Sequence, residues 1–148
     1  MIAIWLMAAG SVFGAAPSVP VTAPPAPFVK ISPTEEALDM GNFWAANEAT
    51  GRTKVHVVAN CPYQLQAALT GFTHVTGRST MSPKHIAVTI NGVRTSLGER
   101  VEIAHSNQPT TLAGVDVPVE LKVAMSNMVL YPAGTYNGTL VITIMAVP

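Results

Sequence analysis

The sequence contains little of what covalent stabilisation or charge-driven binding requires. It has one cysteine, Cys61, so a disulfide within the chain is excluded and packing must stabilise the fold. Charged residues make up only 11% of the chain, and the eight basic side chains balance the eight acidic ones. A neutral chain of this kind has no electrostatic footprint for nucleic acid or for an anionic membrane surface.

Residue patterns that accompany catalysis or metal binding are also missing. Histidine occurs four times, at His56, His74, His85 and His105. No two of these have metal-ligand spacing, and Glu35, Glu36 and Asp39 lack the regular oxygen spacing of a calcium loop. There is no Gly-x-Ser-x-Gly motif. Cys61 falls on the same face of the alternating pattern as its apolar neighbours, so we expect a buried side chain rather than a reactive thiol. We therefore expect no enzyme activity, no catalytic residue, no metal site and no cofactor.

The first sixteen residues, MIAIWLMAAGSVFGAA, contain no charge and are followed by a proline-rich stretch. An apolar run that gives way to small residues is typical of a signal peptide, and it is too short for a spanning helix. The usual basic leader is absent, because the first basic residue is Lys30. We expect a signal peptide at 1–16 and export to the periplasm, cell surface or an extracellular fibre, with no membrane span after cleavage. A buried N-terminal strand is the alternative for this segment.

Residues 17–27, PSVPVTAPPAP, contain five prolines. Each proline lacks a backbone donor and fixes its φ angle, so this stretch predicts an extended, polyproline-like arm. We expect the folded domain to span residues 28–148. Its chain breaks at Ser32-Pro33 and resumes around residues 37–45, where Leu38 and Met40 are expected to point inward.

The rest of the chain alternates between apolar and polar residues, which is the period of a half-buried strand. The clearest alternation covers residues 53–69, 115–125 and 136–144. Pro62 interrupts the first stretch and predicts an edge, a bulge or a bend between two sheets. Shorter apolar sets lie at 86–90 and 101–103, and Asn91-Gly92 suits a two-residue hairpin turn.

No stretch of comparable length has a helical period. We therefore predict an all-β fold, an immunoglobulin-like Greek-key sandwich preceded by the proline-rich arm. Whether this sandwich is complete or one strand short stays open from the sequence alone.

The stretch YPAGTYNGTLVITI, residues 131–144, resembles the last strand of bacterial pilus subunits assembled by the chaperone/usher route and of the related spore coat U domains. In those families a Gly-x-Tyr turn, here Gly134 and Tyr136, precedes an alternating strand. The stretch VHVVANCPYQLQA, residues 55–67, resembles an early strand of the same domains. This chain differs in lacking a second cysteine and a terminal aromatic residue, and in having so much proline in its arm.

The resemblance implies an incomplete sandwich whose groove receives an extended arm from a neighbour. The residues it places along the groove are Val117, Val119, Leu121, Leu140, Ile142 and Ile144. The residues it offers as a donor arm are Val19, Val21, Val29 and Ile31. Gly134 and Tyr136 would form a tyrosine corner, in which the tyrosine hydroxyl bonds nearby backbone. The implied partners are like subunits or other pilus or coat subunits, with a periplasmic chaperone and an outer-membrane usher.

Two functions stay open from the sequence. The first is an exported structural subunit of a pilus or surface coat, assembled by β-strand complementation. The second is a self-contained surface binding or adhesin domain that acts as a monomer and contacts a ligand through an exposed loop such as residues 71–83.

Overall fold

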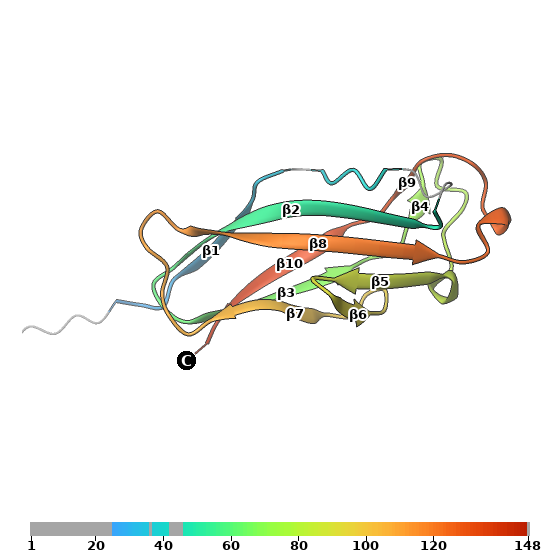
Figure 1. Cartoon of the computed structure of the whole chain (residues 1–148). Helices are drawn as coiled ribbons and strands as arrows, with labels where there is room; N and C mark the ends of the chain where they lie inside the picture. Colours follow the sequence, from blue (N-terminus) through green and yellow to red (C-terminus); the bar gives the residue numbers. More distant parts are fainter. Residues whose placement is uncertain (1–24, 36, 42–45, 148) are drawn as a thin grey trace, which may run out of the picture.

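A computed structural model of the chain describes residues 25–35, 37–41 and 46–147 (Figure 1). The predictions for the signal peptide at 1–16, and for Val19 and Val21 in the arm, lie outside the described residues. Strands build two larger sheets that face each other, with a third, two-stranded sheet at one end (Figure 1). The predicted all-β sandwich is confirmed.

The first sheet has five strands in the order β1-β2-β8-β5-β6, and all neighbours are antiparallel. These strands are β1 (Val29–Pro33), β2 (Glu48–Ala59), β8 (Val115–Met125), β5 (Ile86–Ile90) and β6 (Val93–Thr95). The second sheet has the order β10-β3-β7, with β10 (Leu140–Ala146), β3 (Tyr63–Leu69) and β7 (Val101–Ser106).

Short elements gather beyond one end of these sheets. The small sheet pairs β4 (Thr73–His74) with β9 (Tyr136–Asn137). Two 3-10 helices, η2 (Pro83–His85) and η3 (Met128–Leu130), complete the described elements. We call this side of the sandwich the η3 end and the opposite side the arm end, since residues 25–28 leave the domain there (Figure 1).

The predicted long strand at 53–69 is two strands. Its first part belongs to β2 in the five-stranded sheet, and its last part is β3 in the three-stranded sheet. Pro62 lies between them, where the chain crosses from one sheet to the other, which is one of the positions predicted for it. Proline suits a crossing because it removes no ladder bond there.

The β5–β6 hairpin forms at Asn91-Gly92 as predicted, with φ angles of 47° and 81°. The Asn91 side chain also ties this hairpin to β8. Its Oδ1 accepts a hydrogen bond from the Glu120 N–H at 2.7 Å, and its Nδ2 donates to the Pro118 carbonyl at 3.2 Å. The hairpin is therefore held by side-chain bonds as well as by its ladder.

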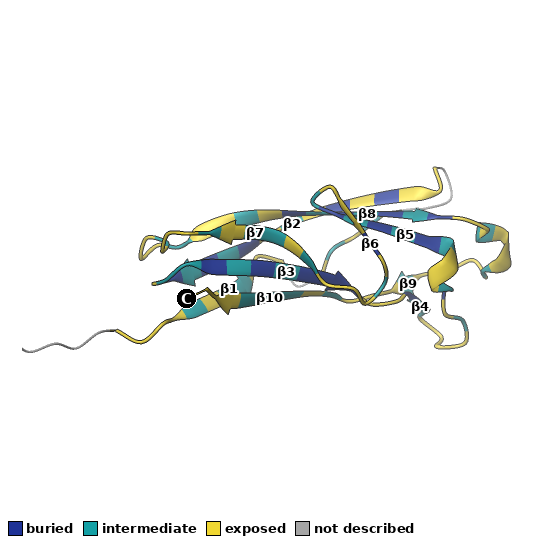
Figure 2. Ribbon diagram, turned by 90° about the horizontal axis from the view of Figure 1, so that it is seen from below, coloured by how far each residue is buried: buried dark blue, intermediate teal, exposed yellow. Residues whose placement is uncertain are grey.

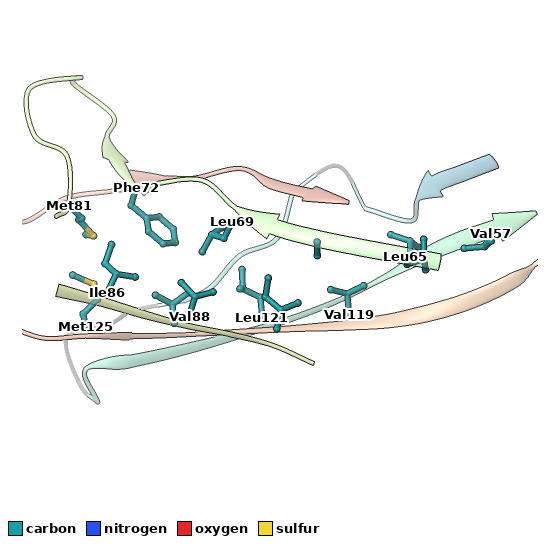
Figure 3. Close-up of a cluster of buried hydrophobic side chains, with 14 of the residues drawn as sticks. Val57, Leu65, Leu69, Phe72, Met81, Ile86, Val88, Val119, Leu121 and Met125 are labelled. Carbon is teal, nitrogen blue, oxygen red and sulfur yellow. The ribbon is translucent and has the colours of Figure 1, made fainter. Parts of the chain in front are cut away.

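The core fills the space between the two large sheets (Figure 3). Its fully buried large side chains come from both sheets: Leu65, Leu69, Ile90, Val57, Val88, Val119 and Val123. Burial of these alternating apolar side chains is the main stabilising term for a domain without disulfides. Outward positions carry charge instead, as in the ion pairs Arg52–Glu120 and Lys122–Glu48, both at 2.7 Å.

We expect Leu65→Ala to lower the free energy of unfolding by about 2–5 kcal/mol, because it opens a cavity at a side chain with no exposed surface. Leu112→Ala is the matched control. Since Leu112 is fully exposed, its loss should change stability by no more than about 0.5 kcal/mol. Urea unfolding of both variants measures the difference, and equal effects would contradict the described core.

Candidate functional site

The strand β10 is the edge of the three-stranded sheet. It pairs with β3 along its whole length, from Leu140↔Leu69 to Ala146↔Tyr63. No strand of the described part of the chain pairs with its other edge. Figure 2 shows the consequence for burial, because β3 is mostly buried whereas β10 is intermediate or exposed.

The strand order identifies which position is missing. In an immunoglobulin-like sandwich one sheet carries strands A, B, E and D, and the other carries C, F and G. Here β1, β2, β8 and β5 correspond to A, B, E and D, while β3 and β10 correspond to C and F. Among the described residues no strand stands at the position of G, next to β10.

A groove with a volume of about 1250 Å³ opens along this edge. One wall consists of residues 134–140 and Ile142, and the other consists of residues 37–41 with residues 53–55 of β2. Its floor is apolar and belongs to the core: Leu69, Phe72, Met81, Leu121 and Met125. Charged residues, among them Glu35, Asp39 and Lys54, lie at the rim.

Three of the six predicted groove residues line this groove: Leu121, Leu140 and Ile142. The other three do not. Val119 is 1% exposed inside the core, and Val117 and Ile144 are half-buried against it. The groove is therefore shifted toward the η3 end relative to the prediction.

The position of β1 explains this shift. It pairs with β2 from Val29↔Ala59 to Pro33↔Val55 and lies near β10, so it covers the arm end of the opening. Val117 of β8 pairs with Val55 of β2, and Val55 also pairs with Pro33, the last residue of β1. Val117 therefore lies level with the end of β1. The groove opens only beyond Pro33, where β1 has ended.

Two of the predicted donor-arm residues, Val29 and Ile31, are part of β1. They pair with Ala59 and Val57 and pack partly buried against their own core. While β1 stays paired, these two side chains are not available to a neighbouring molecule. Of the predicted donor residues, only Val19 and Val21 lie outside this strand.

The sequence did not reveal the role of Gly51, which lies in the first half of β2. A Cβ on Gly51 would lie 2.6 Å from Met40 Sδ and 2.8 Å from Leu38 Cγ. Leu38 and Met40 thus rest on the bare backbone of β2 and form one wall of the groove, although residues 37–41 form no strand. The only signal in the sequence was a glycine at an inward position of a strand. A glycine there indicates that another part of the chain approaches the strand backbone closely.

Tyr136 lines the groove near its η3 end. Its hydroxyl donates a hydrogen bond to the Pro132 carbonyl at 3.0 Å, four residues upstream, which is the bond expected of a tyrosine corner. Its ring meets the His74 ring edge-on, with centroids 5.0 Å apart. Gly134 has φ of 147° and packs so close to His74 that a Cβ would clash there.

Two of the candidate histidines have side-chain partners. His56 bonds Asp116 at 2.8 Å, and His85 bonds the Tyr131 hydroxyl at 2.6 Å. Cys61 is half-buried. The described residues contain no group of three His, Cys, Asp or Glu side chains that could hold a metal ion, and none of their helices is long and apolar enough to cross a membrane.

No protein-family model matches the sequence, and no curated protein matches it. One similar solved structure is described as a chaperone–tip adhesin complex that is vital for synergistic activation of CFA/I fimbriae biogenesis. The match has 13% identity and a TM-score of 0.40, and it covers 81% of this chain and 42% of that chain. We draw no conclusion from a likeness at this level.

We expect Gly51→Ala to lower the free energy of unfolding by about 1–2 kcal/mol, since the new methyl group must displace Leu38 and Met40. Gly71→Ala is the control, because a Cβ there meets nothing within 4 Å. It should change stability by no more than about 0.5 kcal/mol in the same urea titration. If the two variants behave alike, Leu38 and Met40 do not pack on Gly51.

We expect Tyr136→Phe to cost about 1 kcal/mol of stability, because it removes the hydroxyl that bonds the Pro132 carbonyl while keeping the ring against His74. Thermal and urea unfolding measure this loss. No measurable change would remove the tyrosine-corner role.

Proposed function

We propose that this protein is an exported structural subunit of a pilus or surface coat, which assembles by taking a strand from a neighbouring subunit into the groove beside β10. The single observation that carries this proposal is the open position of strand G among the described strands, where the free edge of β10 borders an apolar groove. The proposal gives the protein a structural role and no catalytic one.

Physical chemistry favours an inserted strand at this place. Unpaired N–H and C=O groups on an edge strand recruit another strand, and native proteins normally cover or blunt such an edge. A strand added to β10 would make main-chain hydrogen bonds with it and place alternate side chains over Leu69, Phe72 and Leu121. Each large apolar side chain buried there contributes roughly 1.5–3 kcal/mol.

The proline-rich arm is compatible with donation over a short stretch. Val19 and Val21 have the same parity, so both can face the floor of a groove. Successive residues in a strand direct their backbone groups to opposite neighbours, so Pro20 removes a donor on one side only. The bonds that Val19 and Val21 make with β10 are unaffected if Pro20 faces residues 37–41, which form no ladder.

The proposed partners follow from this mode of assembly. The donor is a like subunit or another pilus or coat subunit. Before assembly, a periplasmic chaperone covers the groove and an outer-membrane usher receives the subunit. Export to the periplasm, cell surface or an extracellular fibre belongs to the same proposal.

One observation favours the alternative, a self-contained surface domain that binds a ligand as a monomer. Leu38 and Met40, which belong to the chain itself, already cover part of the groove from one side. In this alternative residues 28–40 and the hairpin complete the sandwich without a donor strand, and an exposed loop such as residues 71–83 contacts the ligand.

We expect Ile142→Asp to abolish folding or assembly, because it places an unpaired carboxylate in the groove at a cost on the order of several kcal/mol. Val141→Asp is the matched control, since Val141 is the preceding residue of β10 and is 42% exposed. The envelope fraction of the host is run unheated and heated on a denaturing gel. Wild type and Val141→Asp should give a ladder that collapses on heating.

Two results would contradict the proposal. A ladder at wild-type levels in Ile142→Asp would show that the groove is not the assembly site. A single monomer band in both lanes for wild type would favour the self-contained domain. Circular dichroism of the soluble Ile142→Asp protein separates loss of folding from loss of assembly.

A further inference from the structure

Most of the large apolar side chains that the described residues expose lie at the two ends of the sandwich. At the η3 end these are Val75, Val129 and Leu130. At the arm end they are Phe28, Leu112, Val115 and Val147. Val129 and Leu112 are 90% and 102% exposed, so neither contributes to the core.

Backbone hydrogen bonds bring the arm-end residues together around one corner. The Asn60 N–H donates to the Phe28 carbonyl at 3.0 Å, and the Val147 N–H donates to the Pro62 carbonyl at 2.9 Å. The loop that carries Leu112 joins them, since the Thr110 N–H donates to the Ala59 carbonyl at 2.9 Å. The start of the domain, this loop and the end of β10 therefore share one surface.

At the η3 end, the exposed side chains border the groove. Met128 and Tyr131, which flank Val129 and Leu130 in sequence, both line it. The Tyr131 hydroxyl accepts a hydrogen bond from the Ser82 N–H at 2.9 Å, which fixes this turn on the body of the domain. A strand that leaves the groove at this end must pass beside Val129 and Leu130.

The direction of β10 determines on which side of the acceptor the donor's own domain lies. β10 runs from the η3 end toward the arm end (Figure 1). A strand at the G position is antiparallel to its F neighbour, so it runs from the arm end toward the η3 end. The donor's own domain begins at Phe28, immediately after its arm. Its arm end therefore meets the η3 end of the acceptor.

We propose that successive copies of this chain make a second, direct interface, in which Val129 and Leu130 of one copy pack against Phe28 and Leu112 of the next copy. This inference rests on the proposed function, which supplies the direction of the donor strand. The contact is heterologous, because it joins the η3 end of one copy to the arm end of the next. A pair of copies therefore still has one free end of each kind, and further copies can extend it into a fibre. It buries apolar side chains that a strand alone would leave in water.

The test uses the full chain with Cys61→Ser, so that introduced cysteines are the only thiols. The variants are Val129→Cys, Leu112→Cys, the double variant, and a Val129→Cys/Val93→Cys control whose second cysteine lies on β6 away from both ends. Each is exported in the host, treated with a short bis-maleimide and run heated on a denaturing gel. We expect a ladder that survives heating in the Val129→Cys/Leu112→Cys variant and in no other.

The unheated lanes keep the two proposals distinguishable. A heat-sensitive ladder without any cross-linked ladder in the double variant overturns the direct interface and leaves strand donation standing. Cross-linked dimers in either single variant show that like ends meet, which also overturns it. A cross-linked ladder without a heat-sensitive ladder supports the end-to-end contact and overturns strand donation. If neither ladder forms, both the direct interface and strand donation are overturned.

Discussion

The apolar core between the two sheets must be sealed from water along every side of the sandwich, and at β10 the described strands do not seal it. Leu65 is fully buried where β3 is paired on both sides, with β10 through Ile144 and with β7 through Ala104. One strand further, β10 has only one neighbour among the described strands, and the core side chains Leu69 and Leu121 become the floor of a groove. The same missing pairing exposes backbone groups and apolar surface together, which is the combination that an added strand satisfies.

The extent of the groove depends on two local features of the chain. Pro33 is the last residue of β1, and beyond it the chain no longer forms a ladder with β2. Gly51 then lets Leu38 and Met40 lie directly on β2, so that residues 37–41 form a wall without forming a strand. A longer β1 would have closed this side of the sandwich, whereas a larger residue at 51 would have displaced the wall.

The sequence predicted most strands because alternation is a local property. Pro62 and Asn91-Gly92 also behaved as their backbone chemistry requires. The first half of β2 was missed because its inward residues, Ala49 and Gly51, are small and carry little hydrophobic signal. Val117, Val119 and Ile144 do not line the groove, for a different reason. Alternation shows which face of a strand is inward, but it does not show which neighbour covers the strand from the side.

Pro118 shows how this fold accommodates proline within a strand. In β8 it lies opposite Lys54 of β2, and its carbonyl accepts a hydrogen bond from Asn91 Nδ2 on the other side. β5 pairs with β8 only from Leu121 onward, so the missing N–H of Pro118 faces a stretch without a ladder. Pro20 in a donated arm would meet the same condition beside residues 37–41. A proline in a strand with one ladder partner therefore costs no hydrogen bond, provided that its parity directs it away from that partner.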